Sequence, residues 1–504
     1  MEPEFVSEPP TLGAAGLARH AAWNYLAMLA TLVSGFVVIA IAFREVKTEL
    51  LGVYTIAAAS TALLAMSAPA IAFGVTRSTA RLTSGPMVKE ELEFVHGSHA
   101  ILVALGCSVG AGAGGIGVAL WATAAVTFSW HVWLMLGLLV SALLVQLVSA
   151  VLPAAAVGMQ DFRANAVASG LLAVTSLAVV TATIRVLDVG ALGLGQFLGM
   201  TVSRAYLLRW AARRATWLRL RPERPRRATI ASLVRFSGPM ILIAIAAQLV
   251  TWTDVVSVGA LVGASSSALY RAGSLPATQA TGLLWRAYDV VFPLLSRSSD
   301  RDQERATSLL IRVFAALSGV VFAAMIAVRR DIISAVTGDE SSLAQFVLVA
   351  FCLIWAINVP AHGLSLLAIA RGQQTLYVPI VLAEVVLNIA LTVALVSAVG
   401  ARGAALATLL TILLSNMVAL PLVLRRSIPC SFRFVLLDGV APLLVSGAIT
   451  LVALSALGAL DPRVVRLGLQ GVAASGLAAS AVACAGGAAG RRALRASVRR
   501  QDGP

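Results

Sequence analysis

The sequence predicts an all-α integral membrane protein with about fourteen transmembrane helices, in which two parallel-repeat six-helix bundles surround a central cavity and a helix hairpin follows. Three observations predict this fold class: the composition, a series of long apolar stretches and an internal repeat. Of the 504 residues, 59% are hydrophobic and 12% are charged, and the mean hydropathy is +0.90. Soluble domains carry about 25% charged residues, so this composition indicates a membrane protein.

Each apolar stretch is long enough to cross a hydrocarbon layer about 30 Å thick at about 1.5 Å per residue. The fourteen stretches lie near 21–42, 50–75, 97–122, 130–152, 164–186, 189–210, 236–262, 266–295, 308–328, 343–369, 375–398, 403–424, 434–457 and 464–487. They define a cytoplasmic N-terminal segment (1–20), an N-terminal six-helix bundle (21–210), an Arg-rich cytoplasmic linker (211–235), a C-terminal six-helix bundle (236–424), an extra helix pair (425–490) and a basic cytoplasmic tail (491–504). The first residues are acidic and contain no basic n-region, so we expect no cleavable signal peptide.

The basic residues predict the orientation in the membrane. With the N-terminus in the cytoplasm, 26 of the 38 Lys and Arg residues fall in inside segments and eight in outside loops. The positive-inside rule then places both termini in the cytoplasm. The Arg-rich stretch 209–227 is expected to set the topology and to contact anionic lipid, with a contact to substrate as the alternative. Nucleic-acid binding does not fit this setting.

An internal repeat relates the two bundles. Three landmarks recur at nearly one spacing: Tyr54 and Tyr270 at an offset of 216, Gly158 and Gln160 with Gly372 and Gln374 at 214, and Gly190 with Gly403 at 213. Because each half has an even number of spans, both halves enter the membrane in the same orientation. This is a parallel repeat, and it predicts a pathway between the two bundles.

The eighth span, 266–295, has a polar face. At about 100° per residue, five of its residues project within about 80° of Arg271. They are Thr278, Gln279, Gly282, Arg286 and Asp289. The face extends for about 27 Å along the helix, so it must border a protein interior or a water-filled cavity.

Two neighbouring spans carry charges at matching depths. Asp254 in the seventh span is near the level of Arg271, and Glu384 in the eleventh is near that of Arg286, with Asn388 one turn further on. The candidate pairs are Asp254 with Arg271 and Glu384 with Arg286, while Asp289 competes for Arg286.

These residues have two interpretations. In the first, they are ion pairs that join helices. In the second, Arg271 and Arg286, together with Gln279 and Asp289, bind an anionic substrate, and Asp254, Glu384 and Asn388 serve gating or ion coupling. Arg204, near the inner end of the sixth span, is expected to extend toward the interface.

Several kinds of site are not predicted. Neither of the two lysines, Lys47 and Lys89, follows a glycine, so the chain has no phosphate-binding loop of an ATPase. The outside loops are too short for the clustered carboxylates of a membrane glycosyltransferase. The five histidines and four cysteines show no metal-ligand or disulfide spacing. We therefore predict no catalytic residue, metal or cofactor, and no enzyme activity.

Four stretches resemble the polysaccharide-transporter branch of the multidrug/oligosaccharidyl-lipid/polysaccharide (MOP) flippases. They are TELLGVYTIAAASTALLAMSAPAIAFGVTRSTARL (48–82), SGPMILIAIAAQLVTWTDVVSVGALVGASSSALYRAGSL (237–275), VVFPLLSR (290–297) and AEVVLNIALTVALVSAVGARGAALATLL (383–410). The resemblance implies a V-shaped pair of six-helix bundles that carries polyprenyl-diphosphate-linked oligosaccharides by alternating access. It also implies that cavity cations, here Arg271 and Arg286, hold the anionic headgroup, and that Asp254 is the family's acidic position late in the seventh span.

The sequence therefore predicts a flippase that moves such a lipid from the inner to the outer leaflet of a bacterial cytoplasmic membrane, for cell-surface polysaccharide assembly. The alternatives are a drug or organic-cation antiporter on the same fold, a lipid II flippase, a membrane glycosyltransferase and a non-transporting assembly scaffold. The first span lacks the Arg-rich signature of lipid II flippases, which favours another surface glycan. We expect a monomer whose partners are a glycan polymerase or transferase and anionic lipids.

Overall fold

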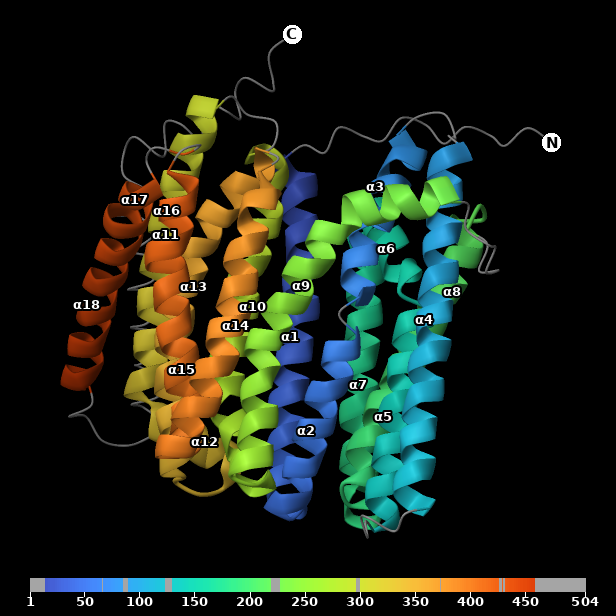
Figure 1. Ribbon diagram of the computed structural model, residues 1–504, viewed down its shortest axis with the longest axis horizontal. Coiled ribbons are helices and arrows are strands. Elements are labelled where there is room, and N and C mark those ends of the chain that lie inside the picture. Colours follow the sequence, from blue (N-terminus) through green and yellow to red (C-terminus); the bar gives the residue numbers. More distant parts are fainter. Residues whose placement is uncertain are drawn as a thin grey trace. The chain divides into compact units, whose positions relative to one another are not determined.

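The computed structural model describes residues 14–65, 67–84, 89–122, 129–218, 227–295, 300–371, 373–425, 428 and 431–457. Within these ranges the chain forms helices and no strand (Figure 1). Ten of the described helices are long and apolar enough to cross a membrane. The predicted all-α membrane fold is confirmed, while the number of fourteen spans stays a prediction. The predicted span 464–487 and the tail 491–504 lie outside the described residues.

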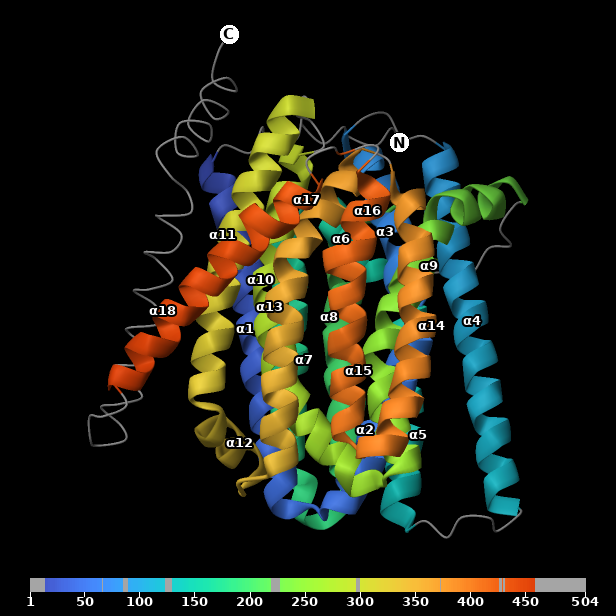
Figure 2. The ribbon, with the colours of Figure 1, turned by 60° about the vertical axis from the view of Figure 1, so that its left-hand side comes forward.

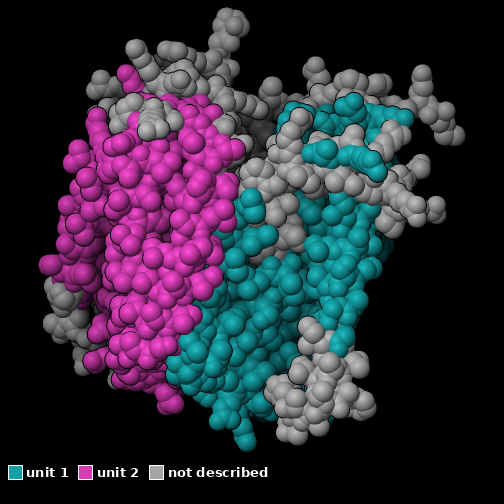
Figure 3. Space-filling view, viewed as in Figure 1, with its two compact units in different colours: residues 1–268 teal, residues 269–504 magenta. Residues whose placement is uncertain are grey.

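The chain divides into two compact units, residues 1–268 and 269–504 (Figure 3). The helices of unit 1 are α1 (Ala14–Glu45), α2 (Thr48–Ala65), α3 (Ser67–Ser84), α4 (Lys89–Ala122), α5 (Trp130–Val148), α6 (Val151–Gly158), α7 (Phe162–Leu187), α8 (Gly190–Arg214) and α9 (Arg227–Leu261). Helix α9 packs against α2, α3 and α4. The seventh predicted span thus belongs to the same compact unit as the first six.

In unit 1, one carboxylate joins the start of α7 to the end of α8. Asp161 caps α7, because its Oδ1 accepts a hydrogen bond from the Ala164 backbone N–H at 3.1 Å. Its Oδ2 accepts a second bond from Trp210 Nε1 on α8 at 2.9 Å. Leu152, Leu207 and Trp210 form an apolar cluster beside this contact. The start of α7 is therefore fixed against the end of α8.

The helices of unit 2 begin in the first turns of α10. They are α10 (Ala264–Leu295), α11 (Asp300–Ala327), α12 (Arg329–Thr337), α13 (Ser342–Ala370), α14 (Gln374–Val399), α15 (Arg402–Leu413), α16 (Leu420–Leu424), α17 (Ser431–Arg433) and α18 (Ala441–Leu457), with the π-helices η1 (Leu414–Ala419) and η2 (Phe434–Val440). Helix α12 was not predicted, since its nine residues begin with Arg329, Arg330 and Asp331 and interrupt no apolar span. Figure 2 shows α14 and α15 side by side.

The internal repeat has a clear counterpart in the helices. Both α7 and α14 have 26 residues, and α14 starts 212 positions after α7 (374 minus 162). The turns that follow them also agree: Asp188 has φ 49° and ψ −132°, and Gly400 has φ 68° and ψ −155°. The offset in this part of the chain is therefore 212. The sequence landmarks at 213 and 214 paired glycines one or two positions away from their structural equivalents.

Candidate functional site

The predicted polar stripe lies on α10. Arg271 and Gln279 are both partly buried. The shorter hydroxyl side chains between them bond to their own helix: Ser274 Oγ donates to the Arg271 carbonyl at 3.2 Å, and Thr278 Oγ1 donates to the Ser274 carbonyl at 2.9 Å. Arg271 and Gln279 are thus the longer polar side chains of this part of the stripe.

Arg286 and Asp289 are the two remaining charged residues of the stripe. Their backbone continues α10, but their side chains lie outside the described residues. The predicted pairing of Glu384 with Arg286, and the competing pairing of Asp289, stay predictions. So does the pairing of Asp254 with Arg271, because these two residues belong to different units.

Aromatic contacts fix the C-terminal half of α10 within unit 2. The Tyr288 hydroxyl donates to the Val359 carbonyl on α13 at 3.0 Å, and its ring stacks on Phe314 of α11 with centroids 4.0 Å apart. Trp285 meets Trp355 of α13 edge to face at 5.5 Å. These contacts set the rotation of α10 about its own axis relative to α11 and α13.

Asp254 lies on α9 and is fully buried, with 0% of its surface exposed. The next residue, Val255, accepts a hydrogen bond through its carbonyl from Ser267 Oγ at 3.0 Å. Gly259 allows α9 to approach Ile56 of α2, since a Cβ there would lie 2.4 Å from the Ile56 Cδ1. A carboxylate so deep in an apolar helix requires compensation by hydrogen bonds or charge.

Glu384 and Asn388 on α14 both face the α15–η1 segment. Ser415 Oγ donates to Glu384 Oε2 at 2.5 Å. One turn away, Asn388 Nδ2 donates to Thr408 Oγ1 at 2.9 Å, and Asn388 is fully buried. Asn388 Oδ1 and Thr411 Oγ1 are also buried but have no partner within the described part of the chain. The predicted coupling residues thus lie in a polar helix contact that keeps unused oxygen atoms.

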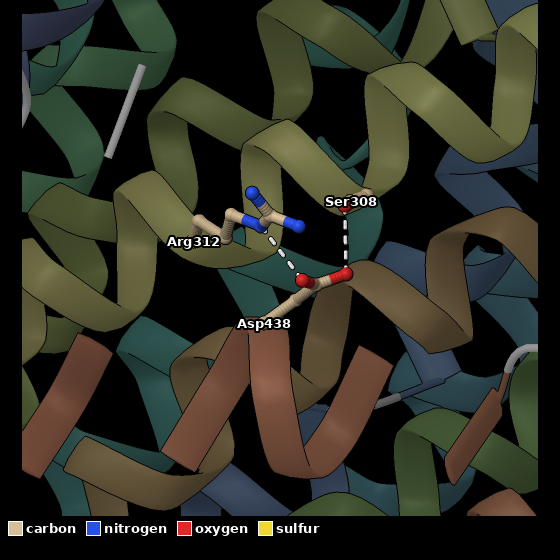
Figure 4. Close-up of polar contacts among 3 residues, drawn as sticks. All are labelled: Ser308, Arg312 and Asp438. Atoms are coloured by element: carbon tan, nitrogen blue, oxygen red, sulfur yellow. Dashed lines mark hydrogen bonds and ion pairs between the residues drawn. The ribbon is translucent and has the colours of Figure 1, made fainter. Parts of the chain in front are cut away.

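A second charged contact of unit 2 joins α11 to η2 (Figure 4). Arg312 Nε donates to Asp438 Oδ1 at 2.6 Å, and Ser308 Oγ donates to Asp438 Oδ2 at 2.7 Å. The carboxylate is 1% exposed, whereas the Arg312 side chain is 40% exposed. Asp438 lies in the predicted span 434–457, in which no site residue was predicted. A search of the thirteenth span for ionisable residues would have found it.

The fold is that of a membrane transporter of the MOP superfamily. A solved MOP superfamily transporter from Pyrococcus furiosus Vc1 (DSM3638) matches with a TM-score of 0.62 and 12% identity over 82% of this chain and 96% of that one. A MATE in complex with MaL6 matches with a TM-score of 0.63 and 14% identity over 83% and 96%. The lipid II flippase MurJ, in an inward closed conformation, matches with a TM-score of 0.62 and 12% identity over 95% and 100%.

The sequence identifies the family. The family model described as polysaccharide biosynthesis protein matches residues 17–299, more than half of the 504 residues. The chain belongs to this family, and its ten described apolar helices indicate a multi-pass membrane protein that shares the fold of the transporters above. No curated protein matches the sequence.

Proposed function

We propose that the protein is a flippase for a polyprenyl-diphosphate-linked oligosaccharide. It moves this lipid from the inner to the outer leaflet of the bacterial cytoplasmic membrane by alternating access, with both termini in the cytoplasm, and supplies cell-surface polysaccharide assembly. The observation that carries the proposal is the polar face of α10, with Arg271 and Gln279 partly buried inside a membrane fold of a polysaccharide biosynthesis family.

The chemistry of the substrate explains why such a face is needed. Each hydroxyl of a sugar costs about 2–7 kcal/mol to strip of water without a replacement hydrogen bond, and a charged diphosphate costs far more. In our proposal Arg271 and Arg286 replace water around the diphosphate, because guanidinium groups match phosphate oxygens in charge and geometry. Gln279 and Asp289 provide hydrogen bonds beside them. The prenyl chain stays in hydrocarbon throughout.

The nature of the substrate can be tested in cells. Depletion of the protein should cause one lipid-linked oligosaccharide to accumulate on the inner leaflet, and this intermediate identifies the glycan. Wild-type protein should clear it, whereas a variant with both Arg271→Gln and Arg286→Gln should not, at equal membrane abundance. Accumulation of lipid II instead would contradict this substrate and favour the alternative that the protein is a lipid II flippase.

The polar contact between α14 and α15–η1 is the proposed ion-coupling element. Glu384 can hold a proton or face a cation, and the unpartnered Asn388 Oδ1 and Thr411 Oγ1 are oxygen ligands of the kind that hard cations prefer. Asp254 of α9 is a second carboxylate for which we propose a role in ion coupling. In proteoliposomes, flipping by the wild type should respond to a proton or sodium gradient, and Glu384→Gln should abolish that response. A variant that still responds as the wild type does would remove Glu384 from the coupling mechanism.

A drug or organic-cation antiporter is the second candidate. Two observations favour it: the match to MATE structures with a TM-score of 0.63, and the buried carboxylate of Asp254. Competition separates the two functions. A soluble sugar diphosphate headgroup should inhibit a flippase but not ethidium export, and measurable ethidium export that Asp254→Asn abolishes would favour the antiporter.

A further inference from the structure

Arg204 on α8 is a charged side chain for which the described part of the chain supplies no counter-charge. Its Nε atom is shielded from solvent and has no hydrogen-bond partner. The described ion pairs involve Arg81, Arg185, Arg312 and Arg371, each with its own carboxylate. Arg204 is partly buried, and none of these described ion pairs compensates its charge.

The position of Arg204 makes the missing counter-charge costly. It lies ten residues, or about 15 Å, before the end of α8, and the flanking Ser203 and Leu207 are buried. Helix α8 packs against α5 and α7, two of the helices that are apolar enough to cross a membrane. The sequence predicts that this side chain reaches the interface; its Nε atom is buried, while the residue as a whole is partly exposed. A guanidinium is the most basic side-chain group in proteins and keeps its charge there.

The position of Arg204 has an equivalent in unit 2 that also carries a buried polar group without a described partner. At the offset of 212 that relates α7 to α14, Arg204 corresponds to Asn416 of η1. The Nδ2 atom of Asn416 is also buried without a partner. Equivalent positions of the two units therefore both offer nitrogen donors to an acceptor that the described residues do not contain, and only the position in unit 1 carries a charge.

We propose that Arg204 binds a phosphate oxyanion carried by a lipid. Guanidinium and phosphate form paired, charge-assisted hydrogen bonds. A bound phosphate also neutralises the charge of Arg204, whereas a bound water molecule would only solvate that charge. Between membrane helices, anions arrive attached to lipids. Two lipids provide this chemistry: an anionic phospholipid of the inner leaflet and the prenyl diphosphate of a lipid-linked sugar. The proposal does not depend on which of them the protein transports.

Lipid binding to the purified full-length protein tests the site. The probes are phosphatidylglycerol, geranylgeranyl diphosphate and uncharged diacylglycerol, added to the protein in micelles. The readouts are native mass spectrometry and the rise in thermal midpoint that each lipid causes. Arg204→Gln should weaken binding of at least one phosphate lipid by about tenfold or more, and Arg204→Lys should retain part of it. The lipid that responds identifies the source of the phosphate, and diacylglycerol should show no difference.

Two controls keep the test decisive. Arg330→Gln, at an exposed position of α12 and outside the Arg-rich stretch 209–227, should bind every probe as the wild type does. Without added lipid, Arg204→Gln should be at least as stable as the wild type, because no described partner is lost. Equal binding of both phosphate lipids by Arg204→Gln and wild type would overturn the proposal. An equal loss in Arg330→Gln, or an Arg204→Gln protein that does not fold, would overturn it as well.

Discussion

The α7–α8 pair of unit 1 and the α14–α15 pair of unit 2 share a backbone arrangement but are held together by different forces. In unit 1 the helices touch at glycines: a Cβ on Gly199 would lie 2.8 Å from the Leu172 carbonyl oxygen. In unit 2 they are joined by hydrogen bonds, from Asn388 to Thr408 at 2.9 Å and from Ser415 to Glu384 at 2.5 Å. The α7–α8 pair is thus held by close apolar packing, whereas the α14–α15 pair is held by hydrogen bonds between polar side chains.

The offset of 212 shows which substitutions produce this difference. Glu384 corresponds to Leu172, Asn388 to Ser176, and Thr411 to Gly199. The contact in unit 2 has therefore gained an ionisable group and an amide where unit 1 has an aliphatic side chain and a hydroxyl. The proposed coupling contact of Glu384 therefore has no counterpart in the α7–α8 pair, where Arg204 has no counter-charge in the described residues.

The largest effect is expected at the charge pair of unit 2. Arg312→Gln removes the counter-charge of Asp438, which is 1% exposed. We expect a loss of about 2–4 kcal/mol in the free energy of unfolding, below the full cost of a broken buried pair because Arg312 is partly exposed. Unfolding by SDS in mixed micelles measures it. The double variant with Asp438→Asn should recover much of the loss, and a single variant within about 0.5 kcal/mol of the wild type would contradict this assignment.

The hydroxyl that holds Glu384 should have the next largest effect. Ser415→Ala removes the only described hydrogen bond to this carboxylate and should cost about 1.5–3 kcal/mol in the same measurement. Its counterpart in unit 1, Ser203, faces Leu172 in the register of the repeat and has no described side-chain partner. Ser203→Ala is therefore expected to change stability by less than about 0.5 kcal/mol. Equal effects at the two sites would show that the two contacts do not differ.

The glycine contact of unit 1 should tolerate no side chain. Gly199→Ala places a Cβ against the backbone oxygen of Leu172, which cannot move without shifting α7, and should cost about 1–3 kcal/mol. Gly170 on α7 provides a matched control, because a Cβ there meets nothing within 4 Å. Gly170→Ala should be neutral or stabilising by up to about 1 kcal/mol. Equal changes in the free energy of unfolding for Gly199→Ala and Gly170→Ala would contradict the close contact between α7 and α8.

The smallest effect is expected at Thr411, and it has the opposite sign. Thr411→Val replaces a buried hydroxyl that has no described partner with a methyl group of similar shape, and should stabilise unit 2 by about 1 kcal/mol. If the oxygen serves a coupling ion, the same variant should weaken the response of flipping to the ion gradient. A destabilised Thr411→Val protein would indicate that the hydroxyl has a partner in the membrane.

The sequence predicted the fold class and the helices of the repeat well, because apolar length and polar periodicity report directly on burial in a membrane. It predicted that Glu384 and Asn388 share one face, since they are four residues apart on one helix. It could not predict their partners Ser415 and Thr408, whose hydroxyls look like ordinary helix residues until α15 is packed against α14. Asp438 was missed for another reason. The site residues were predicted from the two repeated bundles, and Asp438 lies in the thirteenth span, outside both of them.

The π-helices η1 and η2 were also beyond prediction. The register shift within a π-helix leaves no periodic signal in segments as short as 414–419 and 434–440. Both carry polar partners of unit 2, Ser415 and Asp438. Local backbone geometry thus determines which helix face these groups occupy, and the hydrophobic pattern does not contain that information.

The most direct measurement is lipid flipping in proteoliposomes. A fluorescent polyprenyl-diphosphate-linked oligosaccharide is placed in both leaflets, and a membrane-impermeant quencher reports the fraction that changes leaflet. We expect rapid exchange with the wild type and loss of exchange with Arg271→Gln combined with Arg286→Gln, while Arg330→Gln, at an exposed position of α12, flips normally. Unchanged flipping by the folded double variant would contradict the assignment of the α10 stripe, and no flipping by the wild type of any such lipid would contradict the proposed function itself.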